Sequence, residues 1–218
     1  MITINDIRKN KEILVYINQA DSALKELGFT EHAIPHVENC VSVVTKILTL
    51  LNYSDEEINL GQIAAFMHDI GNVINRIDHA QSGAVMSFRI LDKLGMNPEE
   101  ISKIINAIGN HDESTASPVS AISAALILAD KSDVRRSRVR QINKSDFDIH
   151  DRVNYAVTKR NVSFDGKEFI LTLDIDLNIC SIMNYFEIFM KRMLLCQKAS
   201  DYLNIKFSLV INNTKMIW

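Results

Sequence analysis

Apolar residues recur at helical spacing along the first two thirds of the chain. Helices are expected over about residues 7–27, 35–51, 55–70, 78–94, 98–110, 118–140 and 150–158. Pro35 suits the start of the second helix, because the missing N–H of proline would have no helical partner there. Ser54 and Glu57 have the spacing of a capping box, which marks the start of the third. The pattern up to residue 159 therefore predicts an all-α domain.

The apolar spacing changes to an alternation of two in the last quarter of the chain. Val162 and Phe164 precede an Asp165–Gly166 turn, and apolar residues alternate again after it, which predicts a β-hairpin. A long helix and a final strand are expected next, over about residues 181–203 and 205–211. We therefore expect a mainly α fold, a helical bundle with a small C-terminal α+β extension, divided into residues 1–159 and 160–218.

Composition and charge restrict the partners of the protein. The chain has 218 residues, 47% of them hydrophobic, which is enough for a globular core without disulfides. A net charge of -3 creates no global positive field, so no extended nucleic-acid surface is expected and any phosphate binding must be local. The cysteines, Cys40, Cys180 and Cys196, show no CxxC spacing, which indicates free thiols and argues against a cysteine-based zinc site.

Export and membrane insertion are both disfavoured by the sequence. Residues 1–27 mix charged side chains with apolar ones and lack the apolar run of a signal peptide. The most apolar stretch, residues 121–129, is about half as long as a membrane-spanning helix needs to be. We therefore expect a cytoplasmic protein with no membrane partner.

Two aspartates occupy positions that are unfavourable for an anion. Asp69 is expected near the C-terminus of a helix, where the helix dipole disfavours negative charge. Asp130 follows an apolar run, where an unpaired carboxylate would cost several kcal/mol. A bound cation would relieve both. The alternative is that Asp69 caps its helix and that Asp130 pairs with Lys131 or an arginine.

Four histidines are expected at helix ends beside acidic or small residues. With the two aspartates they form one candidate ligand set: His36, His68, Asp69, His79, His111 and Asp130. Imidazole and carboxylate suit Mn, Fe, Co, Ni or Zn, and Mg is also compatible with the carboxylates. One carboxylate can bridge two ions, so the set predicts one or two divalent cations.

These residues resemble a known pattern. His36, the pair His68–Asp69 followed by Ile70–Gly71, and Asp130 followed by Lys131 resemble the HD superfamily of metal-dependent phosphohydrolases, over about residues 30–140. The resemblance implies an all-helical domain with one metal held by His36, His68, Asp69 and Asp130. It also implies a second metal on His79, His111 and a bridging Asp69, as in two-metal members.

One departure from the family pattern bears on the substrate. Members that act on cyclic dinucleotides commonly have lysine after the His-Asp-x-Gly stretch and a downstream Gly-Tyr-Pro motif. This chain has Asn72 at the first position and no such tripeptide. The departure counts against cyclic dinucleotides as substrates.

Basic residues after Asp130 are candidates for binding substrate phosphate. If the helix continues to about residue 140, then Lys131, Arg135 and Arg138 share one face, whereas Arg136 and Arg140 point elsewhere. The alternative is a solvated basic face, with Arg136 paired to Asp133.

Two further side chains are candidate substrate contacts. Arg76 lies three residues before His79, and His32 precedes the helix that carries His36. An ordinary loop histidine is an equally good interpretation of His32, because Pro35 separates it from the helical face of His36.

The resemblance implies hydrolysis of a small phosphomonoester or phosphodiester, with nucleotides among the candidates. Asp69 would hold the metals that activate a water, and Lys131 would stabilise developing charge, so these two are the catalytic candidates. Two alternatives stay open: a di-iron oxygenase with the same type of ligand set, and a nucleotide-sensing module without turnover. The long helix of the extension could pack on the body or on a second copy in a homodimer.

Overall fold

The chain begins with two helices in place of the single one that the sequence predicted. The computed structural model describes residues 2–141 and 143–216, and its first elements are α1 (Ile4–Lys9) and α2 (Lys11–Glu26). Asn10 separates them, because its side-chain oxygen accepts hydrogen bonds from the backbone N–H groups of Glu12 at 2.9 Å and Ile13 at 3.2 Å. This N-cap starts a new helix at Asn10, although the apolar spacing continues through that residue without a break.

The next helices begin where the sequence predicted. They are α3 (Ile34–Leu50), α4 (Asp55–Met67), α5 (His79–Lys93) and α6 (Pro98–Gly109). Ser54 and Glu57 form the expected capping box at the start of α4. A short 3-10 helix, η1 (Ile70–Val73), follows α4, so His68 and Asp69 lie in the junction between these two elements and not inside a helical turn.

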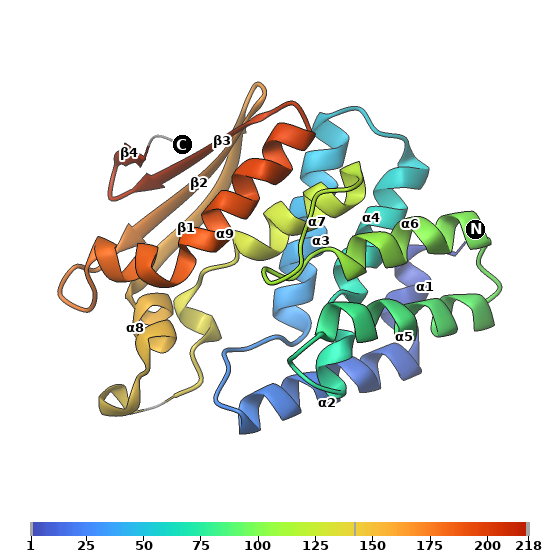
Figure 1. Cartoon of the computed structure of the whole chain (residues 1–218), viewed down its shortest axis with the longest axis horizontal. Coiled ribbons are helices and arrows are strands. Elements are labelled where there is room, and N and C mark those ends of the chain that lie inside the picture. Colours follow the sequence, from blue (N-terminus) through green and yellow to red (C-terminus); the bar gives the residue numbers. More distant parts are fainter. Residues whose placement is uncertain (1, 142, 217–218) are drawn as a thin grey trace.

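Helix α7 (Ala121–Lys131) lies at the centre of the helical part (Figure 1). Every residue from Ile122 to Ala129 is buried, which explains why this stretch is apolar on all sides. Helices α3, α4, α6 and α9 all pack against it. The helix therefore carries Asp130 and Lys131 out of the core at its C-terminal end.

The prediction that this helix continues to about residue 140 is wrong. Ser132 is its C-cap, with its hydroxyl donating to the carbonyl of Ala129 at 3.1 Å. Arg135 is extended, and the chain then forms only a 3-10 turn, η2 (Arg136–Arg138). The buried contact between Asp133 and His36, described below, favours this departure from the helix over the continued apolar spacing.

The last part of the chain forms a four-stranded sheet and one long helix. The 3-10 turn η3 (Lys144–Asp146) and helix α8 (Ile149–Ala156) lead to the predicted hairpin, β1 (Val157–Asp165) and β2 (Glu168–Ile175). The predicted long helix and strand follow as α9 (Ile182–Tyr202) and β3 (Lys206–Ile211), and a strand that was not predicted, β4 (Thr214–Met216), ends the sheet. The strand order is β1-β2-β3-β4, and β2 and β3 are parallel because α9 connects them. The expected mainly α fold with a small α+β extension is confirmed.

The extension packs tightly on the helical part. One apolar core runs from Ile4 to Ile211, and α9 lies along α7 (Figure 1). Arg160 of β1 donates to the backbone carbonyl of Ser132 and to the side chain of Asn39, both at 3.0 Å. Among the described helices, none combines the length and the apolar character that crossing a membrane requires.

Candidate metal centre

The ends of five helices meet at one place and bring the six candidate ligands together. His36 lies in the first turn of α3, His79 is the first residue of α5, and Asp130 lies in the last turn of α7. His68 and Asp69 follow α4, and His111 follows α6. The four histidines and Asp69 are buried, and Asp130 is half-buried.

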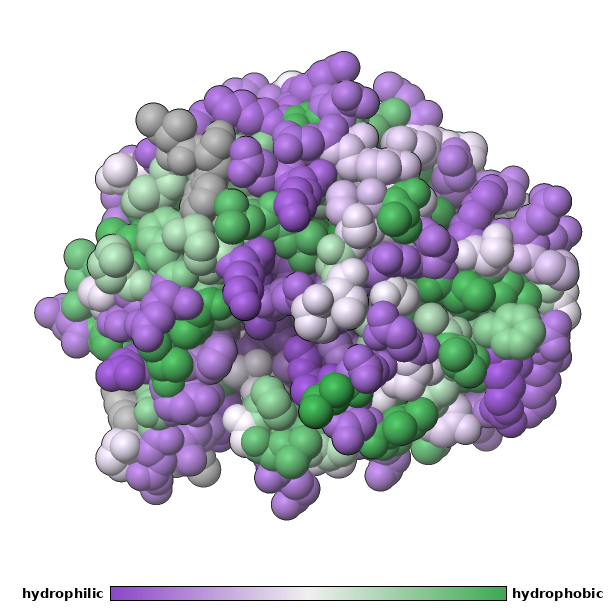
Figure 2. All heavy atoms as spheres, viewed as in Figure 1, coloured by the Kyte–Doolittle hydropathy of each residue, from purple (hydrophilic) through white to green (hydrophobic). Residues whose placement is uncertain are grey.

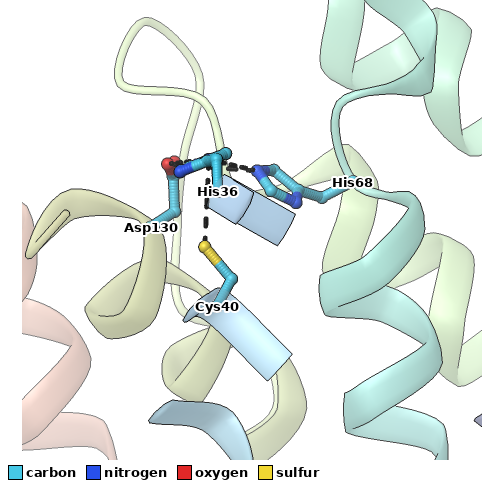
Figure 3. A group of neighbouring side chains, drawn as sticks. All are labelled: His36, Cys40, His68 and Asp130. Atoms are coloured by element: carbon cyan, nitrogen blue, oxygen red, sulfur yellow. Dashed lines mark hydrogen bonds and ion pairs between the residues drawn. The ribbon is translucent and has the colours of Figure 1, made fainter. Parts of the chain in front are cut away.

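The first group of ligand atoms surrounds the Nε2 atom of His36. This atom lies 3.3 Å from Nε2 of His68 and 3.4 Å from Oδ1 of Asp130, and Figure 3 shows these three side chains pointing toward one another. Oδ2 of Asp69 lies 3.6 Å from Nε2 of His36 and 3.3 Å from Nε2 of His68. Two imidazoles and two carboxylates therefore converge on one small volume.

The second group uses the other oxygen of Asp69. Nε2 of His79 lies 3.2 Å from Nε2 of His111. Oδ1 of Asp69 lies 3.5 Å from the first of these atoms and 3.8 Å from the second. Asp69 therefore stands between two pairs of histidines and offers one oxygen to each.

Hydrogen bonds on the far side of each imidazole determine which nitrogen faces the cluster as an acceptor. The Nδ1–H groups of His68, His79 and His111 each donate to the carbonyl three residues earlier, of Ala65 at 2.8 Å, Arg76 at 2.9 Å and Ile108 at 2.6 Å. In its neutral form each imidazole has only this one N–H, so its Nε2 then presents a lone pair to its neighbours. Facing lone pairs cannot hydrogen-bond to each other, but they can share a cation.

The distances between the imidazole nitrogens fit a cation shared by each pair. Two imidazole nitrogens that lie about 2.0–2.1 Å from one tetrahedral ion are roughly 3.3–3.4 Å apart. The two His–His pairs have Nε2 separations of 3.3 Å and 3.2 Å. The donor set of imidazoles and carboxylates is therefore one that could hold divalent transition metals.

Burial and charge set the protonation of these side chains. Burial lowers the pKa of His79 to about 4 and also lowers the pKa of His111, so both are neutral at neutral pH. Burial also acts to lower the pKa of His68, but the neighbouring charges of Asp69 and Asp130 outweigh the effect of burial, so the pKa of His68 is raised. Cationic and hydrogen-bonding neighbours overcome the effect of burial on both carboxylates and hold their pKa values well below the usual range, so both are ionised.

Two polar side chains orient the aspartates. The Asn72 amide donates to Oδ1 of Asp69 at 2.9 Å, and Lys131 Nζ lies 2.6 Å from Oδ2 of Asp130. The alternative pairing of Asp130 with Lys131 is therefore present, but it uses one carboxylate oxygen and leaves Oδ1 facing the histidines.

Cys40 lies beside the first group, although the sequence argued against a cysteine ligand. Its Sγ atom is 3.8 Å from Nε2 of His36, one helical turn earlier on α3 (Figure 3). Burial and the charges of Asp130 and Asp133 raise the pKa of the Cys40 thiol well above its usual value, so it is protonated. The signal for its position is the spacing of four residues from His36, which the search for CxxC pairs does not detect.

Asp133 orients His36 and was not identified from the sequence. Its Oδ2 accepts a 2.7 Å hydrogen bond from Nδ1 of His36, and the carboxylate is fully buried. Arg135 binds both of its oxygens, at 2.6 Å and 3.0 Å. The alternative in which Arg136 pairs with Asp133 is also wrong, because Arg136 donates to the backbone carbonyl of Tyr155 and stacks on its ring.

The predicted shared face of Lys131, Arg135 and Arg138 does not exist, because α7 ends at Lys131. Arg138 is buried and donates to the backbone carbonyls of Glu31 and Asp133, both at 2.8 Å. Arg135 and Arg138 thus hold the segment that orients His36, while Lys131 stays next to the ligand cluster.

A cavity of about 480 Å³ opens over the cluster, and Figure 2 shows a hollow with hydrophilic residues near the middle of this face. Its lining includes the predicted residues His32, Asp69, Arg76, His79, Asp130, Lys131 and Arg138. Arg76 lies 3.4 Å from Nε2 of His79, and the His32 ring packs against the His36 ring at 5.5 Å between centroids. Asp112 and Glu113 also line the cavity and were not identified from the sequence.

The helices of this bundle meet at a buried cluster of histidines and aspartates, a donor set that suits divalent metals. The family model described as "HD domain" matches residues 36–155, more than half of the chain. The chain therefore belongs to the HD-domain family, and the resemblance seen in the sequence is confirmed.

Two relatives are similar to this chain. An uncharacterized protein of Methanocaldococcus jannaschii is 22% identical over 197 residues, covering 80% of this chain and 75% of the relative. A crystal structure described as a predicted HD superfamily hydrolase, from an uncultured Thermotogales bacterium, is 23% identical with a TM-score of 0.45. That match covers 57% of this chain and 68% of the other.

Proposed function

We propose that this protein is a metal-dependent phosphohydrolase that cleaves a phosphomonoester or phosphodiester, with nucleotides among the candidate substrates. The observation that supports this proposal is the position of Asp69, whose two oxygens face two separate pairs of histidines beneath a cavity that Arg76 and Lys131 also line. Membership of the HD family supports the same reaction class.

The two groups of side chains would each hold one divalent ion. His36, His68, Asp130 and Oδ2 of Asp69 form the first set, and His79, His111 and Oδ1 of Asp69 form the second. Bound ions of this kind polarise phosphoryl oxygens and lower the pKa of a bound water to near neutrality. Mn, Fe, Co, Ni and Zn all suit these ligands.

In this proposal, the remaining side chains bind the substrate phosphate or orient the metal ligands. Lys131 holds Asp130 in place and puts a positive charge at the cavity wall, where it stabilises negative charge that develops on the phosphoryl group. Arg76 puts a second positive charge beside His79. The protonated Nδ1 atoms of the histidines stay bound to their carbonyls, so the ligand nitrogens keep one orientation throughout.

The proposed activity predicts metal-dependent turnover in protein purified without chelator or added metal. We expect transition metal in the purified protein and hydrolysis of at least one phosphate ester in a screen with Mn, Ni, Co and Mg, both removed by a chelator. Elemental analysis and phosphate release measure the two quantities. An Asp69→Ala variant purified in parallel is the control, because a contaminating phosphatase would persist in it.

Two other experimental outcomes would favour a different function. Iron content with oxygen consumption and no ester hydrolysis would indicate the di-iron oxygenase. Nucleotide binding without turnover in the metal-loaded protein would indicate the sensing module.

The contact between Asp133 and His36 predicts a loss of metal affinity when the carboxylate is altered. Asp133→Asn keeps the size of the side chain but weakens the hydrogen bond that orients the imidazole. We expect affinity of the first site to fall by about 10- to 100-fold, the usual effect of altering such a partner. Titration of metal-free protein with Zn²⁺ against a chromophoric chelator measures it.

Arg135→Gln is the matched control for this prediction. It removes a cation that binds Asp133 but leaves the contact with His36 intact, so its effect should be smaller. Equal affinities of Asp133→Asn and the unaltered protein would show that Asp133 does not orient a metal ligand.

A further inference from the structure

Helix α9 completes the wall of the cavity from outside the HD domain. It packs along α7 and brings Phe189 and Arg192 to the cavity that also contains Asp69 and Lys131. Both residues lie beyond residues 36–155, which the family model matches. The site therefore includes a part of the chain that the HD domain does not supply.

Arg192 contacts two side chains at this wall. The carbon at the centre of its guanidinium lies 4.5 Å from the centroid of the Phe189 ring, which is itself buried. Its Nε forms an ion pair with Oε1 of Glu113, and 24% of the side chain remains exposed. Stacking and the ion pair occupy the guanidinium face and Nε, so the two terminal nitrogens lie outside these contacts.

Glu113 connects Arg192 to the ligand cluster. The same Oε1 lies 3.9 Å from Nζ of Lys131, which in turn lies 2.6 Å from Oδ2 of Asp130. Arg192 and Lys131 therefore share one carboxylate, and both line the cavity. These contacts alternate two carboxylates with two cations, and Arg192 is the cation at the end of the series away from Asp130.

Two of the other cationic side chains near the cluster are committed to the protein itself. Arg135 and Arg138 hold Asp133 and the backbone near it. Arg192 has no comparable set of backbone acceptors among its described contacts. It therefore fits the role of phosphate ligand better than Arg135 and Arg138, the two arginines for which the sequence predicted it.

We propose that Arg192 binds a phosphate oxygen of the substrate, in a subsite with Phe189 beneath its guanidinium and Glu113 paired with its Nε. The inference rests on the proposed phosphohydrolase function and names a substrate-binding residue for it. Its planar guanidinium can contact two oxygens of one phosphate at once, which an ammonium cannot do in the same way.

Removal of the guanidinium tests the subsite with inorganic phosphate as the probe. Calorimetric titration of the Mn²⁺-loaded protein should show phosphate affinity about tenfold lower or worse in Arg192→Gln. Lys191→Gln is the matched control, because it removes one positive charge from an exposed neighbour on the same helix, and it should bind phosphate as the unaltered protein does. Arg192→Lys keeps the charge, and we expect it to show an intermediate affinity; it serves as the test if the glutamine variant does not fold.

A double-mutant cycle with Glu113 separates phosphate binding from a merely structural role. If Arg192 only neutralises Glu113, then Arg192→Gln should lose its effect in a Glu113→Gln background. If Arg192 binds phosphate, its removal should weaken binding by a similar factor in both backgrounds. Disappearance of the effect in the Glu113→Gln background would overturn the inference.

The inference and the proposed function fail in different ways. Loss of phosphate affinity in Arg192→Gln, with no ester hydrolysed by the unaltered protein, would support the subsite and contradict the hydrolase. Ester hydrolysis with equal phosphate affinity and equal KM in Arg192→Gln and Lys191→Gln would support the hydrolase and contradict the subsite. Failure of the unaltered protein to bind phosphate at millimolar concentrations would overturn the subsite.

Discussion

Replacement of Asp69 by alanine is expected to abolish metal uptake and hydrolysis together. Among the residues that the structure describes, its carboxylate is the one group whose oxygens face both pairs of histidines, at 3.3 Å from His68 and 3.5 Å from His79. Both proposed ions would lose an anionic ligand, and the sites would keep mainly neutral imidazoles. We expect metal content below about one tenth of that of the unaltered protein and no measurable turnover.

Thermal unfolding gives an independent measurement of the same loss. A metal that binds only the folded protein raises its melting temperature by mass action. Chelator should therefore lower the melting temperature of the unaltered protein but not that of Asp69→Ala. Asp112→Asn is the matched comparison, because this carboxylate also lines the cavity but lies 3.9 Å from a single histidine, His79. Full metal occupancy in Asp69→Ala would contradict the two-group interpretation.

Replacement of Gly71 by alanine is expected to destabilise the fold and to displace the second group of ligands. A Cβ atom at this position would lie 2.0 Å from the carbonyl oxygen of His79 and 2.5 Å from the backbone nitrogen of Gly83. Neither backbone atom can rotate away, so η1 and the start of α5 would have to separate. We expect a loss of about 3 kcal/mol or more in the free energy of unfolding.

Urea unfolding and metal stoichiometry measure the two effects of Gly71→Ala. The variant should unfold at lower urea and retain less metal on the second group, because His79 begins the displaced helix. Gly109→Ala is the matched control, since its Cβ would meet only the Ala84 Cβ at an ordinary 3.7 Å. Similar urea midpoints for the two variants would show that the close approach at Gly71 is not required.

The elements that the sequence predicted well are those with local signals. Pro35, the Ser54–Glu57 box and the Asp165–Gly166 turn act within a few residues, and each marks the boundary of an observed element. The break at Asn10 was missed because a single cap interrupts apolar spacing that continues through it. The end of α7 was missed because a contact 97 residues away, between Asp133 and His36, stabilises the departure from the helix.

In the candidate site, too, the residues with local signals were predicted and those that depend on distant contacts were missed. The six predicted ligands come together at helix ends, and the sequence marks these ends except that of α7, which carries Asp130. The residues that support them, Asp133, Glu113 and Arg192, act through partners on other elements. Nothing in their own neighbourhoods distinguishes them from ordinary charged residues, so only the folded chain identifies them.

The hydrogen bonds of the imidazoles have a consequence for how this sequence can diverge. His68, His79 and His111 are each oriented by a main-chain carbonyl three residues earlier, and every amino acid supplies that carbonyl. The acceptor for each ring is therefore kept whatever residue occupies those three earlier positions, although their side chains have other contacts. His36 depends instead on the distant side chain of Asp133, so a substitution at either position constrains the other. The hydrogen bond that orients the ring is thus independent of sequence at three of the histidines, whereas at the fourth it requires His36 and Asp133 to be retained together.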